Sequence, residues 1–273
     1  MEPSTFEVLR QVPGRGSATL SGDDTGGGPP VVLLHGLSAT RRNVVQGSRL
    51  LERRGHRLVL YDARGHGRSS PASSYTYPDM VDDLEAVMAD RGLDRAVLVG
   101  SSMGAATAMA FAMAHPERVS ALVQITPAYT GAPADSERWE RLAAALETGG
   151  AEAFIEADDL DGLPERWRDP LRRVVTQRME RHEHPAAVAA ALRQVPASAA
   201  WDGMGALERV HVPTLVVGSR DAADPTHPLA VAQEYVRRLP RAELAVEAEG
   251  SAPLAWQGGR LSAAIAAFLE RYS

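Results

Sequence analysis

Residues 95–107 read R-A-V-L-V-G-S-S-M-G-A-A-T, an apolar run that ends in a glycine- and serine-containing turn. Continuous apolar runs of this length are typical of strands buried on both faces of a parallel sheet. The small residues that follow, at 104–119, predict a helix. A G-x-S-x-G turn between a buried strand and a helix is a nucleophile elbow, which makes Ser102 the candidate nucleophile.

The residue types at this turn suit such chemistry. Ser102 has to sit on a strained strand-to-helix turn, and Gly100 and Gly104 avoid clashes with the neighbouring backbone. The free N–H groups at the N-terminus of the following helix would then face any negative charge that develops beside the serine.

Working outward, further apolar runs of strand length predict a mostly parallel, doubly wound α/β sheet. These runs lie at 29–36, 56–62, 120–127, 212–219 and 242–248, and helical patterns separate them at 41–54, 76–92, 228–240 and 259–272. Near the N-terminus, residues 6–20 predict a short β-hairpin with Pro13 and Gly14 near its turn, followed by a flexible loop at 22–28.

The alternation of strands and helices stops in the middle of the chain. Residues 128–205 are rich in Ala, Glu and Arg and show no strand pattern, but their apolar spacing predicts helices at about 136–148, 151–157, 164–183 and 185–194. The sequence therefore predicts a core made of residues 1–127 and 206–273, with a helical cap at 128–205 inserted between the fourth and fifth parallel strands.

Composition narrows the classes of protein and partner. The chain of 273 residues has no cysteine, which excludes disulfides and Cys-ligated metals. A net charge of -6 gives no reason to expect nucleic acid or an anionic membrane as a partner. The N-terminus lacks a signal-peptide pattern, and no apolar run has the length of a membrane span. We therefore expect a cytoplasmic monomer or homodimer that acts on a small molecule.

Four segments, in order along the chain, resemble the α/β-hydrolase superfamily over nearly the whole length from residue 30 onward. The segment HGLS (35–38) resembles the family's oxyanion loop, and DARGHGRSS (62–70) resembles its D-x-R-G-x-G-x-S turn. GSSMG (100–104) is the elbow, and GSRDAADP (218–225) resembles the segment that bears the triad acid. Together the four are far more specific than any one alone.

The resemblance implies roles for particular residues. Ser102 would be the nucleophile, and the backbone N–H groups of Leu37 and Met103 would form the oxyanion hole. Asp221 matches the spacing of the triad acid, while Asp224 on the same loop is its rival. The resemblance implies no metal and no organic cofactor.

The family's histidine, however, is missing from its usual place after the last strand. The expected site reads Glu249-Gly250-Ser251, and a serine hydroxyl cannot carry a proton between nucleophile and leaving group near neutral pH. One account is that the base has moved. His227, six residues from Asp221 on the acid-bearing loop, is then the leading candidate, although it also reads as a neighbour of a helix N-terminus at Pro228. His66, His182 and His184 are the alternatives.

These observations predict a hydrolase of a small carboxylic ester, thioester or lactone that works through a Ser102 acyl-enzyme and a relocated general base. A second account is slow turnover of activated esters only, because triad-depleted enzymes keep residual catalysis. A third is a non-hydrolytic enzyme, such as a lyase or isomerase, or a ligand-binding protein that uses the same pocket.

Overall fold

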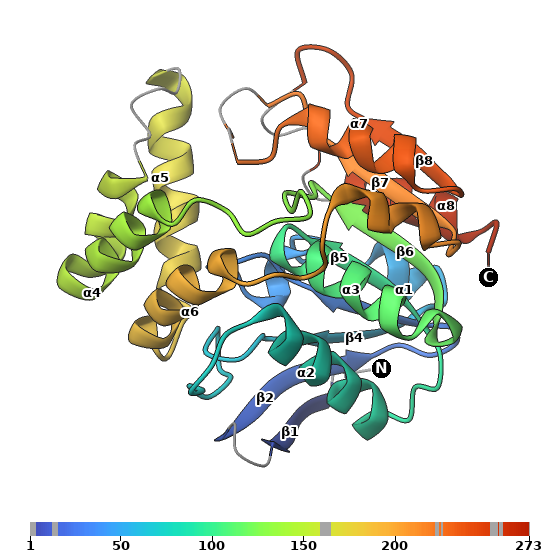
Figure 1. The fold of residues 1–273 in the computed structure, drawn as a ribbon, viewed down its shortest axis with the longest axis horizontal. Coiled ribbons are helices and arrows are strands. Elements are labelled where there is room, and N and C mark those ends of the chain that lie inside the picture. Colours follow the sequence, from blue (N-terminus) through green and yellow to red (C-terminus); the bar gives the residue numbers. More distant parts are fainter. Residues whose placement is uncertain are drawn as a thin grey trace.

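The structure is a computed structural model that describes residues 4–12, 16–158, 165–221, 224, 226–251, 256 and 259–272. Its described residues form an eight-stranded sheet in the order β1-β2-β4-β3-β5-β6-β7-β8 (Figure 1). The strands are β1 (Ser4–Val12), β2 (Gly16–Thr25), β3 (Pro30–Leu34), β4 (Arg57–Tyr61), β5 (Ala96–Ser101), β6 (Val119–Ile125), β7 (Thr214–Gly218) and β8 (Ala242–Val246). This is the α/β-hydrolase fold, as the sequence predicts.

Strands β3 to β8 run parallel, whereas β1 and β2 form an antiparallel hairpin that joins the sheet through β4. All five residues of β7 are buried, as are all but the last of β5. Such strands need helices on both faces, which explains why their apolar runs are continuous rather than alternating.

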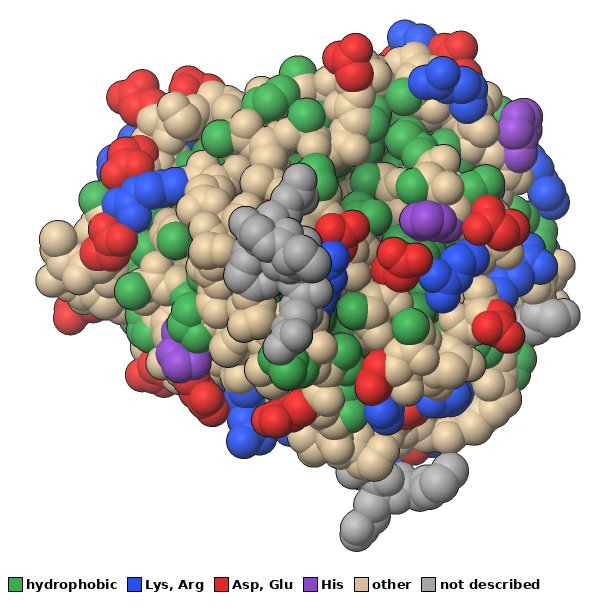
Figure 2. Space-filling view, turned by 60° about the horizontal axis from the view of Figure 1, so that its bottom comes forward, with side chains coloured by type: hydrophobic (Ala, Val, Ile, Leu, Met, Phe, Trp, Pro, Cys, Tyr) green, Lys and Arg blue, Asp and Glu red, His purple; other side chains and the backbone are tan. Residues whose placement is uncertain are grey.

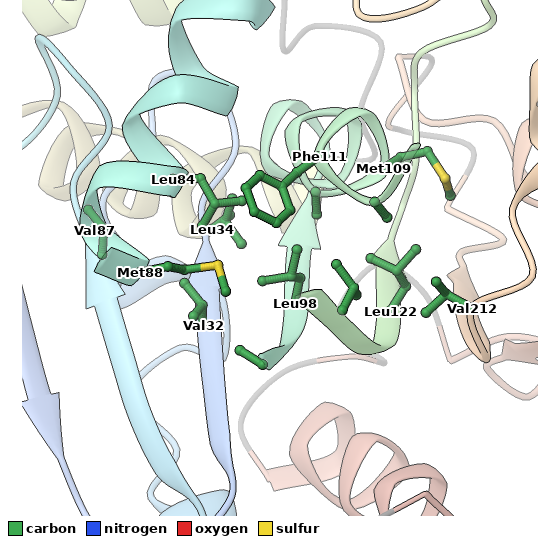
Figure 3. Close-up of a cluster of buried hydrophobic side chains, with 14 of the residues drawn as sticks. Val32, Leu34, Leu84, Val87, Met88, Leu98, Met109, Phe111, Leu122 and Val212 are labelled. Atoms are coloured by element: carbon green, nitrogen blue, oxygen red, sulfur yellow. The ribbon is translucent and has the colours of Figure 1, made fainter. Parts of the chain in front are cut away.

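Helices cover both faces of the sheet. One face carries α2 (Tyr77–Asp90), α3 (Met103–Ala114) and α7 (Leu229–Arg238), while the other carries α1 (Leu50–Arg53) and α8 (Gly259–Leu269). Figure 3 shows the first layer: Leu98 of β5 and Leu122 of β6 face Phe111 and Met109 of α3, and Met88 of α2 packs beside them. Short 3₁₀ helices η2 (Pro116–Arg118) and η4 (Met204–Arg209) lead into β6 and β7.

Among the described residues, three α-helices lie between β6 and β7 in the chain: α4 (Glu137–Ala157), α5 (Glu165–Met179) and α6 (Pro185–Ala197). We call them the insertion. In Figure 1 they stand to one side of the layered sheet. They share a hydrophobic core that contains Phe154 and Met179, while Ala191 and Val195 of α6 pack against Met103 at the start of α3. The insertion therefore rests directly on the elbow.

Two local predictions are wrong. Residues 22–25 are not a loop but extend β2, because they pair with β4. The helix expected at 41–54 is reduced to η1 (Arg41–Asn43) and α1, since Gln46 and Gly47 adopt positive φ between them. The two helices expected at 136–148 and 151–157 are both present, because α4 consists of two helical segments that meet at a kink where Gly150 has a φ of 65° and a ψ of -148°. The turn at Pro13 and Gly14 lies outside the described residues.

The exterior shows no segregation of charge on the face displayed in Figure 2, where acidic and basic side chains are interspersed. Among the described residues, no helix combines the length and the apolar character that crossing a bilayer requires.

Candidate active site

Close packing at the elbow fixes Ser102 in a strained conformation. Ser102 has φ 52° and ψ -110°, between the end of β5 and the start of α3. A Cβ atom on Gly100 would lie 2.2 Å from the Gly104 carbonyl oxygen, and one on Gly104 would lie 2.3 Å from the Leu34 carbonyl oxygen. Only glycine fits such approaches, so both glycines allow the turn that holds Ser102 above the sheet.

A histidine lies against this serine. Nε2 of His227 is 2.8 Å from Oγ of Ser102, and Nδ1 of His227 is 2.7 Å from Oδ2 of Asp224. The Thr226 hydroxyl donates to Oδ1 of Asp224 at 2.6 Å. Ser102 follows β5, whereas Asp224 and His227 come from the loop between β7 and α7. The carboxyl ends of the central strands thus bring a serine hydroxyl, an imidazole and a carboxylate into one hydrogen-bonded chain.

The carboxylate in this chain is not the one that the motif spacing favoured. The carboxylate at His227 Nδ1 belongs to Asp224 rather than Asp221, whose backbone N–H instead donates to the Ser219 hydroxyl at 3.1 Å. The reason lies in the origin of the histidine. The motif spacing of Asp221 suits a histidine that follows the last strand. His227 instead lies on the same loop as Asp221, and it contacts the carboxylate three residues before it.

Electrostatics favour an ionised Asp224. Burial alone would raise the pKa of this carboxyl, but the hydrogen bonds from His227 and Thr226 outweigh burial and lower the pKa to about 2. The group is therefore negative throughout the neutral range. It can orient the imidazole ring and stabilise the imidazolium that would form when His227 takes a proton.

The usual histidine position has a structural use instead. The backbone N–H of Ser251 donates to the Ala248 carbonyl at 3.1 Å. Just before it, the buried Glu247 accepts hydrogen bonds from the Ser219 hydroxyl at 2.9 Å and from the Arg220 N–H at 2.6 Å. Nε1 of Trp256 lies 3.2 Å from the same carboxylate. Glu247, directly after β8, therefore holds the start of the loop between β7 and α7 in place. Sequence reasoning missed Glu247, whose signal was an acidic residue directly after the last predicted strand.

The remaining histidine candidates are engaged elsewhere. His66 is fully buried, with Nδ1 2.9 Å from the Arg64 carbonyl and Nε2 3.4 Å from the Ser38 N–H. Nδ1 of His182 accepts from the Gly67 N–H at 2.9 Å. His184 is the residue that precedes α6. None of the three hydrogen-bonds to Ser102 in the described structure.

Leu37 and Met103, the two residues expected to form an oxyanion hole, lie beside Ser102. Both line the same small cavity as Ser102. Met103 is the first residue of α3, where backbone N–H groups have no partner within the helix. The Leu37 N–H likewise makes no hydrogen bond to a described residue. Two N–H groups from different segments are thus available beside the serine.

Two hollows meet at Ser102. One is a cavity of about 100 Å³ with a mainly apolar lining that includes Tyr77, Tyr129, Trp139 and Val195. The other is a larger cleft of about 580 Å³. Its polar lining includes Arg42, Arg178, Arg181 and His227. A bound molecule can therefore place a small apolar part on one side of the serine and a polar part on the other.

The family model for the alpha/beta hydrolase fold matches residues 29–256. The match covers most of the chain and includes the elbow, the acid loop and the insertion. The chain therefore belongs to the alpha/beta hydrolase family.

Individual proteins are similar to this chain over different shares of its length. A segment of 106 residues is 41% identical to the sn-1-specific diacylglycerol lipase ABHD11 of Xenopus laevis, which is 38% of this chain and 34% of that protein. The chain thus matches about a third of the length of that curated relative. Among solved structures, an esterase from Thermogutta terrifontis is similar at a TM-score of 0.81 and 26% identity, over 99% of this chain and 100% of the other. Est816, described as an N-acyl homoserine lactone degrading enzyme, gives a TM-score of 0.68 and 26% identity over 88% and 91%.

Proposed function

We propose that this protein hydrolyses a small carboxylic ester, thioester or lactone through an acyl-enzyme on Ser102. The observation that carries the proposal is the continuous chain from Ser102 Oγ through His227 to Asp224, with distances of 2.8 and 2.7 Å. A serine is a weak nucleophile without an adjacent base, and a histidine oriented by a carboxylate is the arrangement that activates it.

The chemical steps follow from these contacts. His227 Nε2 takes the proton of Ser102 as Oγ attacks the substrate carbonyl. The N–H groups of Leu37 and Met103 stabilise the negative oxygen of the tetrahedral intermediate. His227 then gives the proton to the leaving alcohol, thiol or ring oxygen. Afterwards it activates a water molecule that releases the acyl group, while Asp224 holds the ring in the required tautomer.

The insertion supports a role as a cap. Trp139 of α4 and Val195 of α6 line the small cavity beside Ser102, so these helices limit the size of the group that enters it. We therefore retain the division into a core at 1–127 and 206–273 and a cap at 128–205. None of the proposed steps needs a metal or an organic cofactor. The esterase and the lactone-degrading enzyme that the fold resembles support the same class of substrate.

Hydrolysis of 4-nitrophenyl butyrate at pH 6 to 9 tests the proposal. We expect turnover by the wild type, and a loss of about 10³-fold or more in kcat in both Ser102→Ala and His227→Ala, because the two residues act as a unit. His211→Ala is the matched control, since His211 is exposed and precedes β7 rather than following it. Labelling of the wild type, but not of Ser102→Ala, by a fluorophosphonate would show the covalent step directly.

The alternative is a non-hydrolytic enzyme or a ligand-binding protein that uses the same pocket. The absence of a histidine at its usual position is the observation that favours this alternative, whereas the contact of His227 with Ser102 supports a relocated base and therefore hydrolysis. Absence of Ser102-dependent turnover, together with absence of fluorophosphonate labelling in folded protein, would favour this alternative over hydrolysis.

A further inference from the structure

Arg178 is a cation in the cleft beside Ser102 that has no ion-pair partner among the described residues. Arg178, on the last turn of α5, lines the same cleft as Ser102 and His227. Its Nε atom is buried without a hydrogen-bond partner, and its guanidinium makes no hydrogen bond or ion pair to a described residue. Buried polar groups are nearly always satisfied, and a charged one is costly to leave without a partner.

The nearby acids do not account for Arg178. Asp158 is paired with Arg138, and Asp224 holds His227 and Thr226. Both carboxylates are close enough to act on Arg178 through space, yet neither lies within ion-pair distance of it. Burial lowers the pKa of Arg178, and the attraction of these two carboxylates only partly offsets that effect. A negative group that entered the cleft would relieve this cost.

Two further arginines add positive charge to the cleft that Arg178 lines. Arg42 and Arg181 line the cleft as well, and both are exposed at its edge. None of the described residues that line the cleft is acidic. On the opposite side of Ser102 the small cavity is mainly apolar. One side of Ser102 therefore suits an apolar group, and the other side suits a negatively charged group.

We propose that Arg178 is a specificity residue that binds a carboxylate of the substrate, so that the natural substrate is an ester, thioester or lactone bearing a carboxylate in the cleft. A guanidinium matches a carboxylate in geometry through paired N–H donors, which a neutral ester cannot use. This inference rests on the function proposed above and names the substrate class of the same site.

Matched esters test the inference and locate the carboxylate. Mono(4-nitrophenyl) glutarate carries it on the acyl side, 5-pentanoyloxy-2-nitrobenzoate carries it on the leaving group, and 4-nitrophenyl pentanoate is the neutral reference for both. The quantity compared is the ratio of kcat/KM for a charged ester to kcat/KM for the neutral one. Rates with Ser102→Ala are subtracted from every measurement to remove uncatalysed hydrolysis.

We expect Arg178→Met to lower this ratio by about 10- to 100-fold for one of the two charged esters, the range of a charge-assisted hydrogen bond. Arg178→Lys should lower the ratio less, because lysine keeps the positive charge but lacks the paired N–H donors of the guanidinium. Arg172→Met is the matched control: Arg172 is an exposed residue of the same helix, and its loss removes the same charge. That variant should leave the ratio within about twofold of the wild type.

A binding measurement separates this inference from the proposed hydrolysis. Calorimetry with glutarate uses Ser102→Ala alone and combined with Arg178→Met or Arg172→Met. We expect the Kd to rise about 10-fold or more only with Arg178→Met. Ser102-dependent turnover of the neutral ester, with a ratio and a Kd that Arg178→Met does not change, would overturn the carboxylate site and leave the hydrolase proposal standing. Glutarate binding that depends on Arg178, without any turnover, would support the site and reject hydrolysis.

Discussion

At the scale of single residues, the site places an imidazole three positions from the carboxylate that it contacts. Asp224 and His227 occupy one short loop, with Thr226 between them bonding to both. Neither residue belongs to the segment after β8. The serine at position 251 is therefore compatible with a complete triad, because the imidazole arrives from a different segment.

The identity of the acid leads to a direct comparison of two variants. Asp224→Asn should lower kcat for 4-nitrophenyl butyrate by about 10²- to 10⁴-fold, because an amide neither stabilises the imidazolium nor fixes the tautomer of His227. Asp221→Asn, on the same loop, should change kcat by less than about threefold. The pH–rate profiles of both variants are the measurement. The reverse order of effects would return the acid role to Asp221.

Sequence reasoning reached part of this site. Ser102 could be predicted because the elbow imposes its own residue pattern, and His227 could be nominated because few histidines follow the carboxyl end of a strand. Asp224 could not be preferred over Asp221, since motif spacing reflects a histidine in its usual position. Arg178 carried no signal, because an unpaired guanidinium is a property of the packed structure and not of spacing.

At the scale of elements, the site depends on how closely α3 approaches the sheet. The carbonyl of Leu34 at the end of β3 lies against Gly104 in the first turn of α3. This contact fixes the direction in which the helix leaves β5. Apolar runs predicted the strands well, because burial on both faces leaves little choice of residue. The segment at 41–54 was harder to predict, since its helical spacing is interrupted by backbone conformations that spacing does not reveal.

The close approach predicts that Gly104 is required for folding as much as for chemistry. Gly104→Ala would place a methyl group 2.3 Å from backbone, where no flexible side chain can yield. We expect a loss of about 1–3 kcal/mol in the free energy of unfolding, measured from urea denaturation. Gly205→Ala is the control, because a Cβ there meets open space. Equal midpoints for the two variants would show that the elbow tolerates a side chain.

At the scale of the whole molecule, three buried histidines connect the insertion to the core. His66 lies between His35 and His182, with ring centroids 5.2 and 5.6 Å apart. His35 follows β3, His66 belongs to the turn after β4, and His182 follows α5. Each ring has one nitrogen facing a backbone carbonyl and the other facing a backbone N–H. This pattern requires one donor and one acceptor per ring, which only neutral imidazole provides.

The cluster predicts that acid weakens the protein near pH 6. Burial lowers the pKa of His35 to about 4 and also lowers the pKa values of His66 and His182, although Asp62 partly opposes the shift in the latter two. The unfolded chain binds these protons near pH 6.5, before the folded chain does. The free energy of unfolding should therefore be highest above pH 6.5 and should fall as the pH decreases toward 4.

Urea denaturation between pH 7.5 and 5 measures this slope, in a range above most carboxyl titration. Each histidine that binds a proton only on unfolding contributes up to about 1.4 kcal/mol per pH unit. His182→Gln keeps one acceptor and one donor but cannot be protonated, so its slope should be shallower by about one proton. His211→Gln, at an exposed position, should keep the slope of the wild type. If the stability of His182→Gln and of the wild type fell in parallel, the imidazole at 182 would not be held neutral. The contacts of His182 with Ser38 and Gly67 would then not contribute to the pH dependence of stability.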